Sequence, residues 1–126
     1  MTQIEETLVT RLLAESTLTA LVGQRIEPVL NSQDTALPAL SYQLISRAGE
    51  HSHDGPSINK PRIQLTALAT TYSQVVAVLA ACKTALDGVS WGSGVASFCE
   101  NEFDGWDNSR ETGVFVRRMD VLVVDP

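Results

Sequence analysis

Residues 61–88 read PRIQLTALATTYSQVVAVLAACKTALDG and contain a strand that leads directly into a helix. Apolar and polar residues alternate from Pro61 to Leu68, which is typical of a strand with one buried face. Thr71 and Gln74 have the spacing of a capping box, which satisfies backbone donors in the first turn of a helix. Helical spacing then continues to Gly88, which is placed to end the helix. The residues predicted to face the core are Ile63, Leu65, Ala67, Tyr72, Val75, Val76, Leu79, Cys82 and Leu86.

Upstream of this segment, the sequence predicts a long helix, a short helical turn and two strands. Thr2 and Glu5 form another capping box, and an apolar stripe follows it at helical spacing. The short turn is expected to end at Gly23. Segment 24–30 is interpreted as an edge strand because it contains a proline, and segment 38–46 as a strand with alternating faces. The residues predicted to face the core here are Ile4, Leu8, Val9, Leu12, Leu13, Leu40, Tyr42 and Leu44.

Downstream of the helix, two further strands are predicted over residues 95–103 and 114–124. The turn-rich segment 90–94 precedes the first of them, and the polar connection 104–112 separates the two. Because several strands follow one another without a crossover helix, the sheet should be largely antiparallel. We therefore predict an α+β two-layer sandwich, in which two main helices cover one face of a sheet of four to five strands. The chain is expected to form one domain over residues 1–126.

Residues 47–60, RAGEHSHDGPSINK, are predicted to be an irregular loop. They include two glycines and a proline and almost nothing apolar. Loops of this length are usually functional or disordered. The segment contains His51 and His53, which resemble metal ligands, so a small metal-dependent enzyme is one reading of the chain. Two histidines do not complete a site, however, and solvated loop residues are the simpler interpretation.

The sequence contains few other motifs that are typical of catalytic or ligand-binding sites. Cys82 and Cys99 do not form a CxxC motif and are interpreted as small buried side chains in a reducing cytoplasm. The G-S-G at 92–94 does not sit in a G-x-S-x-G nucleophile elbow, and no phosphate-binding glycine loop occurs. We therefore expect no catalytic residues, no metal and no cofactor.

Composition indicates a globular protein that does not grip nucleic acid. The 126-residue chain is 44% hydrophobic and 19% charged, with a net charge of −6. Phosphate binding needs clustered lysine and arginine, whereas the basic residues here are scattered. The N-terminal segment lacks the pattern of a signal peptide, and no apolar run is long enough to span a membrane. We expect a soluble protein made in a cytoplasm.

Six short motifs follow one another along the chain, namely LVGQRIEP at 21–28, LPALSYQ at 37–43, DGP at 54–56, RIQL at 62–65, ALDG at 85–88 and ETGVFVRRMD at 111–120. In this order and spacing they resemble the tail-completion or tail-terminator family of tailed phages and prophages. The last motif is similar to the ETGLYRRxxDF ending of that family. Ala67 departs from the pattern, because a larger residue is expected at its position.

The resemblance implies a structural virion protein at the head-proximal end of the tail, assembled in the bacterial cytoplasm. Such a protein is expected to form a ring, usually hexameric, that caps the tail tube, ends its polymerisation and offers a surface to the head connector. Its partners would be further copies of itself, the tail tube protein and the head connector, and DNA would pass through without specific binding. Another connector or stopper of the head–tail junction is the nearest alternative. The metal-dependent enzyme described above is the second, and a non-viral interaction module is the third.

The same reading assigns three groups of residues. The loop at 47–60 is expected to be mobile in the free subunit and to become ordered against the tube or the next subunit. Within this loop, the predicted contacts are Gly49, Glu50, His51, Ser52, His53, Asp54 and Gly55. Acids expected to line the lumen are Glu100, Glu102, Asp104, Asp107 and Glu111, with the Glu50–Asp54 stretch as the alternative. Candidate interface residues are Trp91, Trp106, Arg117 and Arg118, although Trp91 and Trp106 serve equally well as core anchors.

Overall fold

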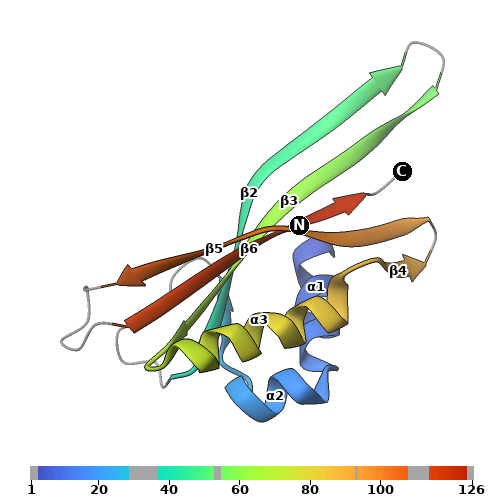
Figure 1. Ribbon diagram of the computed structural model, residues 1–126. Coiled ribbons are helices and arrows are strands. Elements are labelled where there is room, and N and C mark those ends of the chain that lie inside the picture. The colour runs from blue at the N-terminus through green and yellow to red at the C-terminus, as the bar shows by residue number, and fades with distance from the viewer. Residues whose placement is uncertain (1–2, 29–36, 53–54, 93, 108–113, 125–126) are drawn as a thin grey trace.

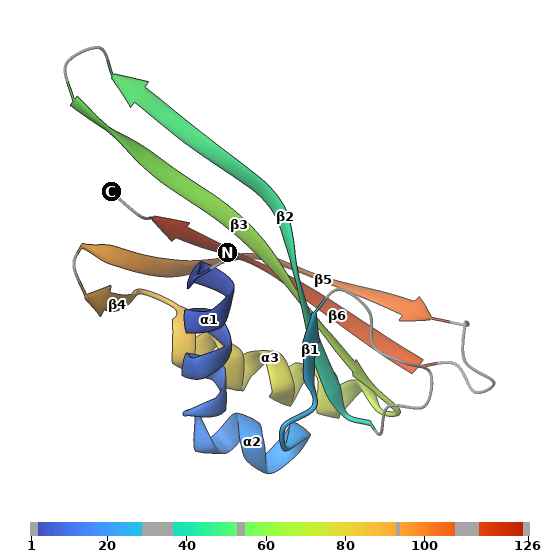
Figure 2. The ribbon, with the colours of Figure 1, turned by 180° about the vertical axis from the view of Figure 1, so that it is seen from behind.

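The computed structural model describes residues 3–28, 37–52, 55–92, 94–107 and 114–124. In these ranges the elements are α1 (Gln3–Leu13), α2 (Ser16–Val22), β1 (Ile26–Pro28), β2 (Ala39–Ser52), β3 (Gly55–Ala69), α3 (Tyr72–Leu86), β4 (Val89–Gly92), β5 (Val95–Asp107) and β6 (Val114–Val124). The strands form one sheet in the order β1-β2-β3-β6-β5-β4. Every pair is antiparallel except β1 with β2. The helices lie on one face of this twisted sheet and leave its other face without a helix (Figures 1 and 2). The predicted α+β class is confirmed.

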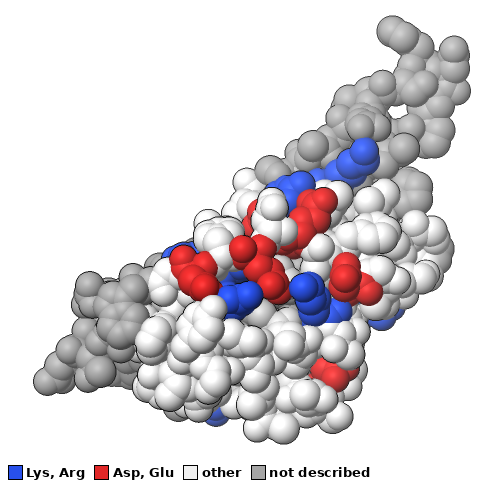
Figure 3. Space-filling model, viewed as in Figure 1, with Lys and Arg blue, Asp and Glu red and all other residues white. Residues whose placement is uncertain are grey.

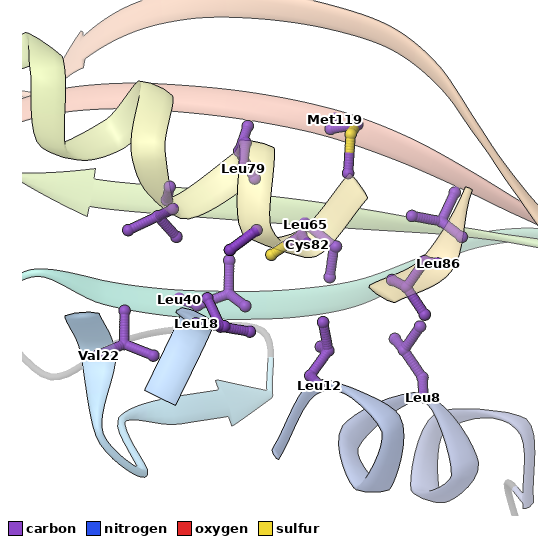
Figure 4. Close-up of a cluster of buried hydrophobic side chains, with 14 of the residues drawn as sticks. Leu8, Leu12, Leu18, Val22, Leu40, Leu65, Leu79, Cys82, Leu86 and Met119 are labelled. Atoms are coloured by element: carbon purple, nitrogen blue, oxygen red, sulfur yellow. The ribbon is translucent and has the colours of Figure 1, made fainter. Parts of the chain in front are cut away.

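The core lies between the three helices and the covered face of the sheet (Figure 4). Leu8 of α1 points toward Leu86 of α3 there, and Leu12 and Leu79 belong to the same cluster; all four are buried. The predicted cap of α3 is present, because the Thr71 hydroxyl accepts a hydrogen bond from the backbone N–H of Gln74 at 3.3 Å. Predicted inward residues that prove fully buried also include Leu40, Ile63, Leu65, Ala67, Val75 and Cys82.

Four residues that were predicted to face the core are instead exposed, namely Leu13, Leu44, Tyr72 and Val76, with exposed fractions between 36% and 47%. Leu44 lies opposite Ile63 on the covered face of the sheet, and its strand, β2, extends beyond the helices (Figure 1). Tyr72 is the first residue of α3 and packs edge-on against Phe115 at the margin of the core. Periodicity predicts which face a side chain takes, but it does not show how far the covering layer extends.

Two predictions about the downstream strands are wrong. Residues 89–92 form an additional strand, β4, so the sheet has six strands in the described chain instead of four to five. Gly92 and Gly94 have φ values of 89° and 83°, which let the chain reverse tightly from β4 into β5. β5 also continues through residues 104–107, which were predicted to belong to a connection, and these residues pair with β6.

The predicted irregular loop at 47–60 is also wrong for the residues that the structure describes. β2 and β3 continue past the rest of the sheet as a long hairpin that projects from one corner (Figure 1). Their pairing runs from Arg47 opposite Pro61 to Ser52 opposite Gly55. The two strands are held by backbone hydrogen bonds, which require no apolar alternation, and this explains why the sequence pattern did not predict them. We call residues 46–52 and 55–61 the arm; His53 and Asp54 lie outside the described residues.

Candidate functional site

A β-bulge at Asn101 decides which side chains of β5 lie beside the helices. Asn101 has φ 42°, a left-handed value that asparagine adopts more readily than most residues. The register of β5 against β6 shifts by one residue between Glu100 and Glu102. As a result, Glu100 lies on the uncovered face of the sheet, whereas Glu102 and Asp104 lie on the helix face. No pattern of the sequence indicated this change of face.

On the helix face, the bulge places two carboxylates around one guanidinium. Arg117 lies 2.7 Å from Asp104 and 3.1 Å from Glu102. The Tyr72 hydroxyl donates to Asp104 at 3.0 Å, and the Lys83 ammonium lies 3.5 Å from Glu102. Burial alone would lower the pKa of Arg117, but its hydrogen bonds to the two carboxylates and their charges raise it. Figure 3 shows acidic and basic side chains gathered in a band across this side of the molecule.

A second group of charges lies on the uncovered face. The Arg62 guanidinium is 2.8 Å from Glu100 and 3.7 Å from Asp120. Gln64 donates from its side-chain amide to Asp120 at 3.4 Å. Glu100 and Asp120 are direct neighbours across β5 and β6, so Arg62 offsets a repulsion that would otherwise destabilise the strand pair.

The acids predicted to line a lumen therefore do not form one surface. Glu100 is separated by the sheet from Glu102 and Asp104, and each of the three is paired with a cation of its own subunit. The side chain of Asp107 and the whole of Glu111 lie outside the described part of the chain. An acidic lumen stays a prediction, but these three carboxylates bring less net charge to it than their number suggests.

Trp91 anchors three elements inside the subunit. Its indole N–H donates to the Ser97 hydroxyl at 2.9 Å, and that hydroxyl donates to the backbone carbonyl of Leu86. The Arg11 guanidinium lies 5.5 Å from the centre of the Trp91 ring, within the range of a cation–π contact. Trp91 is therefore a partly buried core residue that joins α1, β4 and β5, and its contact with a neighbouring subunit stays a prediction.

The other candidate interface residues are placed less uniformly. Arg117 is bound within its own subunit, as described above. Arg118 is half-buried, and its guanidinium reaches Gly105 of β5, where an added Cβ would lie 3.1 Å away. Trp106 lies opposite Phe115 in the register of β5 and β6, and the structure does not describe its side chain. Contacts of these residues with a neighbouring subunit stay predictions.

Of the two candidate metal ligands, the structure describes only His51. His51 belongs to β2, near the tip of the arm, and His53 lies outside the described residues. In the described chain, no three His, Cys, Asp or Glu side chains are grouped so that they would hold a metal ion. None of the described helices has the length and apolar character that crossing a membrane requires.

The two cysteines lie on packed surfaces and are free thiols. Cys82 of α3 is buried, and Cys99 of β5 is partly buried against the same core. Burial raises the pKa of the Cys82 thiol, and the nearby Cys99 raises it further. Burial also raises the pKa of Cys99 to about 12, with Asp87 adding to the effect. Both side chains are therefore neutral at physiological pH and act as small core residues, as predicted.

These thiols predict a loss of stability in alkaline solution. In the unfolded chain each thiol ionises near its ordinary pKa of 9.0, whereas the folded protein keeps it neutral to higher pH. The folded state then binds more protons, so the free energy of unfolding should fall above pH 9, by up to about 1.4 kcal/mol per pH unit for Cys82 and less for the partly exposed Cys99. Urea unfolding at pH 7, 9 and 10 measures this slope. The double variant Cys82→Ala, Cys99→Ala should show a smaller slope, and an unchanged slope would contradict the assignment.

Comparisons with known proteins agree with this architecture. A family model described as "Tail completion protein gp17" matches residues 6–124. A chain in the solved structure "Virion of native gene transfer agent (GTA) particle" has a TM-score of 0.72 and 18% sequence identity, with 94% of this chain and 89% of that chain covered. At this identity the likeness establishes the fold alone. Among curated proteins, no sequence matches the chain.

Proposed function

The chain belongs to the tail completion protein gp17 family, and from this membership we propose that it forms a ring that caps the tail tube, ends tube polymerisation and provides the surface for head joining. The match over residues 6–124 is the observation that carries the proposal, because it covers all of the described elements except the first three residues of α1. Membership makes the chain a structural protein of a phage tail and a part of the virion. We infer no enzymatic activity.

The shape of the subunit supports a ring. The arm projects from one corner of the sheet, and the far ends of β5 and β6 project from the opposite corner (Figures 1 and 2). A subunit that offers two different patches makes head-to-tail contacts, which close into a ring when the rotation between subunits permits. We propose a hexamer, whose further partners are the tail tube protein on one side and the head connector on the other.

The net charge of −6 per subunit suits a ring through which DNA slides without binding. We propose that acids of the Glu100–Glu111 stretch or of the Glu50–Asp54 stretch contribute to the lumen. Neutralising such acids should slow the passage of DNA and leave ring assembly intact. An assembly defect instead would contradict a lumen position for the residue concerned.

The absence of this protein should produce tail tubes of uncontrolled length or tails that fail to join heads. Electron microscopy of particles made with and without the protein measures tube length and the fraction of tails attached to heads. Purified protein added back should restore attachment. Tubes of normal length and capped appearance without the protein would contradict termination, and binding to isolated heads but not to tails would favour a connector or stopper of the head–tail junction.

A further inference from the structure

One free backbone edge of the sheet belongs to β5. β4 pairs with β5 over Val95–Ser97, and beyond Ser97 no described strand lies on this outer side. The carbonyl of Ser97 and the N–H of Cys99 both point outward. The N–H of Gly88 donates to the Ser97 carbonyl at 2.9 Å, and the N–H of Cys99 donates to the Asp87 carboxylate at 2.9 Å. The edge is therefore closed as far as Cys99 and open after it.

The register identifies the outward groups of this edge. Cys99 lies opposite Val121, and backbone groups along a strand point to alternate sides. β6 carries no bulge, so its residues alternate regularly from Val121 to Met119, Arg117 and Phe115. The residues of β5 that lie opposite these positions therefore have backbone groups that point outward, as those of Cys99 do. The bulge at Asn101 is included in this count because it belongs to β5 alone. The residues with outward backbone groups are thus Glu102, Asp104 and Trp106.

A second free edge belongs to β2 along the arm. The N–H of Leu40 donates to the carbonyl of Arg25 at 3.0 Å, so Leu40 points away from β3. Among the described residues, the pairing of β1 with β2 ends at Tyr42. Leu40 lies opposite Ala67, and every second residue of β3 is counted from there. Counting along β3 avoids the register shift that β2 has after Leu44. The outward residues of β2 beyond β1 are then Leu44, Arg47 and Gly49.

The other edge of the arm is interrupted by a proline. β3 pairs with β6 over Arg62–Ala69, so the arm part of β3 has no third strand among the described residues. Pro61 lies opposite Arg47, and by the same alternation its backbone nitrogen points away from β2. Proline has no N–H to donate, and prolines are a common protection of edge strands. Leu44, Arg47 and Gly49 on the β2 side all keep their N–H, so that side offers the more complete row of donors and acceptors.

The arm also lacks what a free hairpin needs for stability. A two-stranded hairpin is marginal in water unless a third strand or a packed face supports it. Between residues 46 and 60, Ala48 and Ile58 are the apolar residues of the sequence. So little apolar surface does not suit docking into a hydrophobic groove. A partner that completes the arm would have to supply backbone hydrogen bonds, which means a strand edge.

We propose that the outer edge of β2 in one subunit pairs with the outer edge of β5 in the next copy of the same chain. The two edges lie on opposite sides of the sheet, so the contact is head-to-tail, as a ring requires. The sheet then continues from subunit to subunit. This inference rests on the proposed ring and adds the contact that builds it.

A proline at Asp104 tests the pairing. Asp104→Pro removes an outward N–H and a carboxylate, whereas the reference variant Asp104→Ala removes the carboxylate and keeps the N–H. If the edges pair, the proline variant needs about tenfold more protein than the alanine variant to cap uncapped tail tubes, since one hydrogen bond is lost and its partner carbonyl is left unsatisfied. Negative-stain counts of capped ends against protein concentration measure this ratio. Equal concentrations for two folded variants would overturn the proposal.

Hydrogen exchange on the unaltered protein gives a reading that does not depend on how the proline variant folds. On assembly at tube ends, the amides of the outward residues in both edges should become protected, while the alternate amides, which already pair inside the sheet, change little. Rings in which these edges stay exchangeable would overturn the edge pairing and leave the ring proposal intact. Failure of the unaltered protein to bind tube ends or itself would overturn both.

Discussion

Replacing residues 47–61 with Asn-Gly is expected to leave the subunit folded and to abolish the capping of tail tubes. Ser46 and Arg62 are direct partners across β2 and β3, so the two residues can close the shortened hairpin as a tight turn. None of the described residues of the main apolar core lies between 47 and 61, so the free energy of unfolding should change by less than about 1 kcal/mol.

The loss of assembly should be large because the variant lacks Arg47 and Gly49, which are two of the three outward residues of the β2 edge beyond β1. Two or more backbone hydrogen bonds per contact correspond to roughly a hundredfold weaker capping, and the effect multiplies around a ring. Sedimentation with tail tubes and urea unfolding of the free subunit measure the two quantities separately. Capping at unaltered protein concentrations by the shortened chain would exclude the arm as a ring contact.

Leu40→Ala should destabilise the subunit severely, whereas Leu44→Ala on the same face of the same strand should not. Leu40 is fully buried against α2 and α3 residues in the core, whereas Leu44 is 36% exposed beyond the helices. Removing a buried leucine leaves a cavity and costs about 2–5 kcal/mol, which lowers the melting temperature of a domain of this size by roughly 10 °C. The Leu44 change should cost less than about 1 kcal/mol.

This pair of variants is its own control, because both replace leucine by alanine in one strand. Thermal and urea unfolding monitored by circular dichroism give the two values directly. Equal losses would show that the core extends to the base of the arm. The Leu44 variant has a second use, since its backbone edge is intact and its capping of tubes should therefore survive.

The sequence singled out two stretches of the chain but did not show how their side chains are arranged. The sequence predicted contacts for residues 47–60 and a lumen position for the acids of the Glu100–Glu111 stretch, and both roles stay predictions. It did not predict their geometry. The face on which each acid lies depends on one residue with left-handed backbone geometry, Asn101. The residues around Asn101 in the sequence do not indicate that a bulge forms there. Tyr72 was assigned to the core, although its hydroxyl belongs to the charged group around Arg117.

The sequence by itself determined the α+β class, the three helical segments, the strands 61–68 and 114–124, and most of the core. It could do so because burial of a helix stripe or a strand face imposes a period that is visible in one segment at a time. The tertiary structure decided the rest, namely β4, the long arm, the bulge at Asn101 and the ion pairs of the acids. Each of these depends on backbone hydrogen bonds or charges between segments far apart in the chain, and pairing of that kind leaves no periodic trace in either partner.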